Sequence, residues 1–154
     1  MDQHLTEHHA LHRLVSEIAA RATVAVGLAG IALIHLLDSI GKWSETRYLF
    51  WMYIALMAGS LAAAGAVLFT RSRAAWLAAA AVAAGALVGY VVNRTVGLPN
   101  ATGDIGNWTE PLGLASLFVE AAVVAVSVVG FSLGDRHRAV ELVARPSRAE
   151  RLAA

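Results

Sequence analysis

Acidic, basic and imidazole side chains interrupt long apolar segments of this sequence, where such groups are costly. His35 and Asp38 are three residues apart, so in a helix they share one face. Glu120 lies about eight residues into another apolar segment, which places it roughly 12 Å deep at 1.5 Å per residue. A carboxylate near the centre of a bilayer costs at least ~2.5 kcal/mol and usually marks a cavity or a partner. Glu120 should therefore be protonated, paired with a cation or bound to a ligand.

Further polar residues lie near the ends of the same apolar segments. Tyr90 and Arg94 are four residues apart, Glu45 precedes a second apolar segment, and Trp108 and Glu110 lie in a polar connection. Imidazole and carboxylate groups suit Zn, Cu or Fe, so His35, Asp38, Glu45 and Glu120 are also candidate metal ligands. The candidate binding residues are His35, Asp38, Glu45, Tyr90, Arg94, Trp108, Glu110 and Glu120.

The elements that position these residues are four predicted membrane spans. The 154 residues are 58% hydrophobic and 15% charged, whereas soluble domains carry about 25% charged residues. Four segments contain the roughly 20 apolar residues that a span needs: about 22–40, 48–69, 74–93 and 112–133. Short connections make neighbouring spans antiparallel. We therefore expect an all-α, up-down-up-down four-helix bundle forming one transmembrane domain over 1–134.

Both ends of the chain have their own patterns. Apolar residues recur at helical spacing within 3–21, which predicts a short amphipathic helix at the membrane interface. His4, His8 and His12 line one side of that helix, where a solvated polar face is favoured over a metal site. The basic tail, 135–154, is expected to lie on anionic headgroups. The net charge of +1 gives no reason to expect nucleic acid binding.

The basic residues predict an orientation. Nine arginines share one side of the predicted membrane, and three basic residues lie on the other side. Basic residues concentrate on the cytoplasmic side, so both termini should be cytoplasmic. Antiparallel threading then brings the candidate binding residues to the outer half of the bundle, beneath the Gly- and Pro-containing connection 97–113. We expect this connection to be a lid over an outward-facing polar basin, with Arg94 folding down towards Glu120 and His35.

Small residues predict where helices approach closely. Gly85 and Gly89 form a G-x-x-x-G pair, a spacing that lets helix backbones pack together. Packing within one chain is favoured over a face for a homo-oligomer. The chain has no cysteine, which excludes disulfides and thiolate metal sites.

Two strings resemble a known group of proteins. "GYVVNRTVGLPNATGDIGNWTEPLGLASLFVE" (89–120) resembles small four-span membrane proteins common in actinobacteria, and "HLLDSIGKWSETRY" (35–48) resembles their other polar segment. The resemblance implies a multi-pass protein of the bacterial plasma membrane and no particular activity. Members of that group often carry a second histidine where this chain has Lys42 and Trp43, which disfavours a bis-histidine haem or metal site.

Three functions remain open on the sequence alone. The basin binds a small ligand or ion, in connection with transport; or it holds a metal or haem in a redox subunit; or its charges only pack an accessory subunit of a membrane complex. The sequence does not predict an enzyme, because it contains neither a G-x-S-x-G elbow nor a His-Glu-x-x-His motif.

Overall fold

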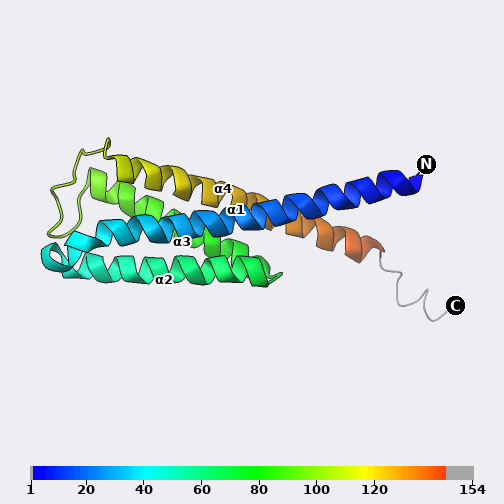
Figure 1. Ribbon diagram of the computed structural model, residues 1–154, viewed down its shortest axis with the longest axis horizontal. Helices are drawn as coiled ribbons and strands as arrows, with labels where there is room; N and C mark the ends of the chain where they lie inside the picture. Colours follow the sequence, from blue (N-terminus) through cyan, green and yellow to red (C-terminus); the bar gives the residue numbers. More distant parts are fainter. Residues whose placement is uncertain (1, 145–154) are drawn as a thin grey trace.

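The computed structural model describes residues 2–144, with side chains for His8 and 11–132. It contains α1 (Asp2–Glu45), α2 (Arg47–Phe69), α3 (Arg73–Thr95) and α4 (Pro111–Ala144) (Figure 1). All four helices are long and apolar enough to cross a membrane. The predicted all-α four-helix bundle is confirmed. The last part of the predicted basic tail, 145–154, lies outside the described residues.

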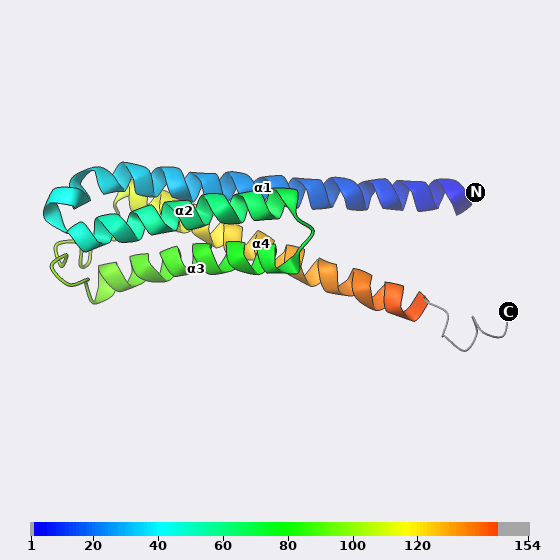
Figure 2. The same ribbon diagram turned by 90° about the horizontal axis from the view of Figure 1, so that it is seen from below.

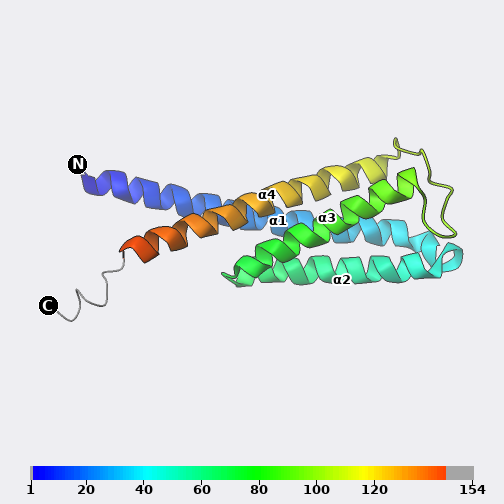
Figure 3. The same ribbon diagram turned by 180° about the vertical axis from the view of Figure 1, so that it is seen from behind.

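The helices form a ring in which each is antiparallel to the next. α1 packs along α2 and α4, α3 packs along α4 and α2, and α1 and α3 are diagonal partners (Figures 2 and 3). The α1–α2 connection at Thr46 and the α3–α4 loop, 96–110, lie together at one end, which we call the loop end. The α2–α3 connection and the two terminal extensions lie towards the opposite, terminal end.

The terminal helices are longer than the sequence patterns predict. The amphipathic segment expected over 3–21 is not a separate helix, because α1 runs unbroken to Glu45. Neither proline nor glycine interrupts 3–21, so nothing in the chain stops the helix between this segment and the span. Leu11, Leu14, Val15 and Ile18 remain exposed along the resulting extension. α4 likewise continues past 133 to Ala144, through the start of the predicted tail.

Arg21 closes the terminal end of the bundle. Its Nη1 donates hydrogen bonds to the carbonyl oxygens of Val67 (2.6 Å) and Thr70 (2.7 Å), at the end of α2. These carbonyls have no partner within the helix, so the cation satisfies groups that would otherwise be open. Ser72 then caps α3 by accepting a hydrogen bond from the amide of Ala74 (3.2 Å). These contacts fix the turn between α2 and α3.

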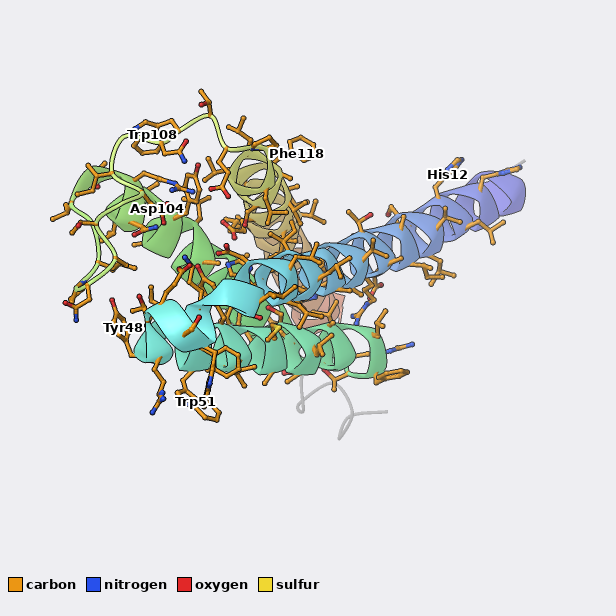
Figure 4. The ribbon with its side chains drawn as sticks, turned by 60° about the vertical axis from the view of Figure 1, so that its left-hand side comes forward. His12, Tyr48, Trp51, Asp104, Trp108 and Phe118 are labelled. Atoms are coloured by element: carbon orange, nitrogen blue, oxygen red, sulfur yellow. The ribbon has the colours of Figure 1, made fainter. Side chains whose placement is uncertain are left out.

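The apolar core occupies the half of the bundle nearer the terminal end. Its largest buried side chains include Val24, Leu28, Ile31, Val67 and Trp76. Buried alanines of α2 and α3 complete the core. Outward-facing apolar side chains, such as Phe118, remain exposed around the bundle (Figure 4). These exposed faces fit contact with a lipid bilayer, and the four spans indicate a multi-pass membrane protein.

Candidate functional site

A cavity of about 340 Å³ opens among the four helices at the loop end. His35 and Asp38 line it from α1, Tyr53 from α2 and Arg94 from α3. Its apolar wall includes Leu56 and other small or aliphatic residues of all four helices: Ile34, Leu49, Met52, Gly85, Ala86, Gly89 and Leu112. Most of the apolar core lies on the terminal side of this cavity. The bundle therefore combines a packed half with a hollow, partly charged half.

Asp38 and His35 form one side of the cavity together with Tyr53. The hydroxyl of Tyr53 donates a hydrogen bond to Oδ2 of Asp38 (2.7 Å). The rings of His35 and Tyr53 meet edge to face, with centroids 5.2 Å apart. Nδ1 of His35 lies 2.9 Å from the carbonyl oxygen of Ile31. Because a carbonyl only accepts, Nδ1 carries the proton and Nε2 is left for another partner.

Arg94 is the buried cation of the site and holds the α3–α4 loop. Its side chain is 5% exposed and lies at the end of α3. Nη1 is 3.0 Å from Oδ1 of Asp104, and Nη2 is bonded to Glu110, at the other end of the loop. The guanidinium also lies over the ring of Tyr90, 5.0 Å from its centroid. One cation therefore joins α3 to two points of the loop.

The loop is tied to the helices on both sides of the cavity. The hydroxyl of Tyr48, in α2, donates to the carbonyl of Pro99 (2.7 Å), and the amide of Gly106 donates to the carbonyl of Arg94 (2.9 Å). Gly97 adopts φ +80°, where a Cβ would lie 2.9 Å from Ile105, so a tight bend needs glycine there. Figure 4 shows Asp104 and Trp108 on the loop and Tyr48 on the neighbouring helix. The loop thus lies across the end of the bundle.

Trp108, in the loop, meets the ring of Tyr90 edge to face, with ring centroids 6.1 Å apart. Replacing Trp108 by alanine should remove this contact and raise the rate of proteolysis within the loop several-fold, while the helices stay resistant. Limited proteolysis of the purified protein in detergent would measure the rate. Ile105→Ala provides the comparison, because it removes an exposed loop side chain that lies beside Gly97 and is not part of the aromatic contact between Trp108 and Tyr90. An unchanged cleavage rate in Trp108→Ala would show that the aromatic contact does not hold the loop.

Glu120 is fully buried but does not meet Arg94. Its side chain is 0% exposed, and Oε1 accepts a hydrogen bond from Ser116 one turn earlier in α4 (2.6 Å). Its Oε2 has no hydrogen-bond partner. The expected pairing of Arg94 with Glu120 is wrong, because the loop supplies closer carboxylates to the guanidinium.

The structure brings together five of the eight candidate binding residues, since His35, Asp38, Tyr90, Arg94 and Glu110 line the cavity. Glu45 points away: it is 64% exposed and bonds Nζ of Lys42 (3.2 Å). Trp108 contacts the ring of Tyr90, and Glu120 accepts a hydrogen bond from Ser116, but neither residue lines the cavity itself. Within the described residues, no three His, Asp or Glu side chains gather as metal ligands, so His35, Asp38, Glu45 and Glu120 do not form a metal set.

The polar or charged lining residues absent from the sequence-based set are Lys42, Tyr53, Asn93, Asp104 and Ser116. Tyr53 supplies the hydroxyl on Asp38, and Asn93 donates to the carboxylate of Asp104 (3.2 Å). Tyr53 and Asp38 lie at similar distances from the α1–α2 connection, so antiparallel counting could have paired them. Asp104 had no comparable signal, because its position depends on how the loop folds back onto α3.

The G-x-x-x-G pair has a different role from the expected one. A Cβ added at Gly85 or Gly89 would meet no atom within 4 Å, and both glycines line the cavity. They therefore widen the cavity and do not bring α3 against another helix of this chain. Close approach occurs instead at Gly27, where an added Cβ would lie 2.4 Å from Val123 of α4.

These features define a multi-pass, all-α protein whose membrane domain is a four-helix bundle with a polar cavity at the loop end. Comparison of the chain with protein-family models, curated proteins and solved structures finds no match.

Proposed function

We propose that the cavity is a binding site for a small ligand or ion, and that it faces the outside of a bacterial plasma membrane. The observation that carries the proposal is the combination of a 340 Å³ cavity, charged side chains and an apolar wall within one membrane domain. Small-molecule sites are typically concave, mostly apolar and equipped with a few placed polar groups. Ionisable residues inside membrane spans also favour a functional site over a purely structural one.

The proposed orientation rests on the distribution of basic residues. Arg13, Arg21, Arg71 and Arg73 lie towards the terminal end, as do Arg136 and Arg138 of α4, whereas Lys42, Arg47 and Arg94 lie at the loop end. This excess favours a cytoplasmic terminal end, with both termini inside. The resemblance to actinobacterial four-span proteins agrees with a location in a bacterial plasma membrane. The cavity would then open outwards, beneath the α3–α4 loop, where it could receive a solute for uptake or for transfer to a partner.

The contacts of Arg94 support a separate, structural contribution within the same site. Its two carboxylate partners belong to the loop, so this cluster closes the bundle whether or not a ligand is present. Asp38 differs, because its described partner is a neutral hydroxyl. The ligand-binding proposal therefore depends on the α1 side of the cavity more than on Arg94.

Cysteine labelling tests both the cavity and its orientation, because the chain contains no cysteine of its own. Gly89→Cys places a thiol on the cavity wall without a clash. In intact cells, a membrane-impermeant maleimide should label this variant. Gly103→Cys, in the open part of the loop, should label readily, and Ser72→Cys, between α2 and α3, should label only after the cells are broken.

Gly103→Cys and Ser72→Cys together test the orientation independently of whether solutes enter the cavity. Labelling of Ser72→Cys in intact cells, with Gly103→Cys protected, would reverse the proposed orientation. If both controls behave as expected but Gly89→Cys resists the reagent in intact and broken cells, the cavity is closed to solutes and the binding proposal fails.

A further inference from the structure

We propose that the ligand of this cavity is a small organic monocation, such as a primary alkylammonium ion, held by the carboxylate of Asp38. This inference rests on the proposed function, since it names the chemical class that the same cavity would bind. It follows from the charges that line the cavity, from the partners that each charge already has, and from the size and apolar character of the space.

The first step is the charge balance of the cavity. Its lining contains three carboxylates, Asp38, Asp104 and Glu110, and two cations, Lys42 and Arg94. These five groups together carry a net charge of −1, from three negative and two positive groups. A charge in a low-dielectric site requires a counter-charge or strong hydrogen bonds. The missing counter-charge is positive.

The second step identifies which carboxylate lacks a cation. Asp104 and Glu110 share the guanidinium of Arg94. Asp38 accepts a hydrogen bond from Tyr53, and among the described residues it has no ion pair. A neutral hydroxyl satisfies one acceptor of a carboxylate that has about four lone-pair positions. Asp38 can therefore accept further hydrogen bonds from a cation in the cavity.

Lys42 is a cation of the lining that could compete with a ligand for Asp38. It lies one turn along α1 from Asp38 and also lines the cavity, so its ammonium would repel a cation that approaches the carboxylate. Its Nζ, however, is bonded to Oε2 of Glu45, outside the cavity. Glu45 thus holds the ammonium of Lys42 away from Asp38. Removing the charge of Lys42 should make the cavity more attractive to a cation.

The third step distinguishes an organic cation from a bare metal ion. The volume of about 340 Å³ is in the range of small-molecule pockets. Leu49, Met52 and Leu56 supply an apolar wall that an alkyl chain can contact. The aromatic ring of Tyr53 adjoins Asp38, and aromatic faces attract organic ammonium groups. Among the described residues no set of three metal-ligating side chains surrounds Asp38.

The test compares three probes of similar size: n-butylammonium, butyrate and n-butanol. Binding to the purified protein in detergent is measured by titration calorimetry, and protection of Gly89→Cys from the maleimide is measured in cells. We expect n-butylammonium to bind and to protect, and the other two probes to do neither. Asp38→Asn should weaken n-butylammonium binding by about 30-fold, the equivalent of about 2 kcal/mol for loss of a desolvated charge partner.

Two variants isolate the charge of Asp38 from the stability of the fold. Lys42→Met should tighten n-butylammonium binding several-fold, because it removes a repulsive cation, and this result does not depend on a folded Asp38 variant. Glu110→Gln, which changes a carboxylate already paired with Arg94, should weaken binding less than Asp38→Asn does. Equal binding in wild type, Asp38→Asn and Lys42→Met would overturn the assignment to Asp38.

Failure of this inference is distinguishable from failure of the proposed function. If Gly89→Cys is labelled, and butyrate or n-butanol protects it while n-butylammonium does not, the cavity binds solutes but the cation inference is wrong. If Gly89→Cys is never labelled, the binding function fails as well.

Discussion

Replacing Arg94 by methionine should destabilise the bundle by about 3 kcal/mol, the lower end of the cost of breaking a buried ion pair. The guanidinium is almost fully buried, but Asp104 and Glu110 are each more than a third exposed, so water relieves part of their loss. Methionine keeps much of the apolar stem and removes the charge. Thermal or denaturant unfolding in detergent would measure the change, and limited proteolysis should detect release of the loop.

A pair of double-mutant cycles identifies the true partner of Arg94. Arg94→Met and Glu110→Gln should be strongly non-additive, because the two side chains bond to each other. Arg94→Met and Glu120→Gln should add, because Glu120 bonds Ser116 and has no ion pair with Arg94. The opposite pattern, coupling with Glu120 and additivity with Glu110, would mean that the arginine folds into the bundle and that the loop is held by other contacts.

Replacing Gly27 by alanine should also destabilise the protein by about 2 kcal/mol, a typical cost of overpacking. The added Cβ would lie 2.4 Å from Cγ2 of Val123, a buried and β-branched side chain with little freedom to move. α1 and α4 would have to separate. Since α1 carries His35 and Asp38 and α4 carries Ser116, the same variant should also weaken ligand protection of a thiol in the cavity.

Gly30→Ala is the matched control for this prediction, one turn along the same helix. Its added Cβ would lie 3.6 Å from Val119, an ordinary contact. Alanine exceeds glycine in helix propensity by up to about 1 kcal/mol, so Gly30→Ala should leave stability unchanged or raise it. Gly27→Ala should therefore lower the unfolding temperature, whereas Gly30→Ala should not. A fall of similar size in both would point to a general intolerance of α1 and not to a specific contact.

The fold could be predicted from the sequence because each span is a long apolar run between short connections. In a bilayer, a helix is the simple way to satisfy the backbone of such a run. Helix ends were less predictable. The apolar content begins near 22 and ends near 133, but the hydrogen-bonded helices extend beyond both points, to Asp2 and to Ala144. The apolar pattern therefore predicts which part of a helix contacts lipid better than it predicts the residue at which the helix ends.

The site was partly predictable for a similar reason. Counting along antiparallel spans places His35, Asp38, Tyr90 and Arg94 at one end, and these residues do share a cavity. Such counting cannot predict which of the residues at that end bond to one another, because this depends on the conformation of the loop. Arg94 takes the loop carboxylates in place of Glu120, and Asp104 enters the site through a bend that the spacing of residues does not specify. Similarly, Gly85 and Gly89 predict a place with little side-chain volume, but their spacing does not predict whether a neighbouring helix or a cavity occupies that place.

The unbroken course of α1 has a mechanical consequence. At 1.5 Å per residue its 44 residues make a rod about 66 Å long. α1 runs from the terminal extension to the loop end (Figure 1), with the exposed residues Leu11, Leu14 and Ile18 in its first half and Asp38 near its last turns. No proline interrupts the helix to act as a hinge. The exposed apolar extension and the carboxylate in the cavity thus belong to one continuous helix, so a tilt of the extension would also tilt the segment that carries Asp38.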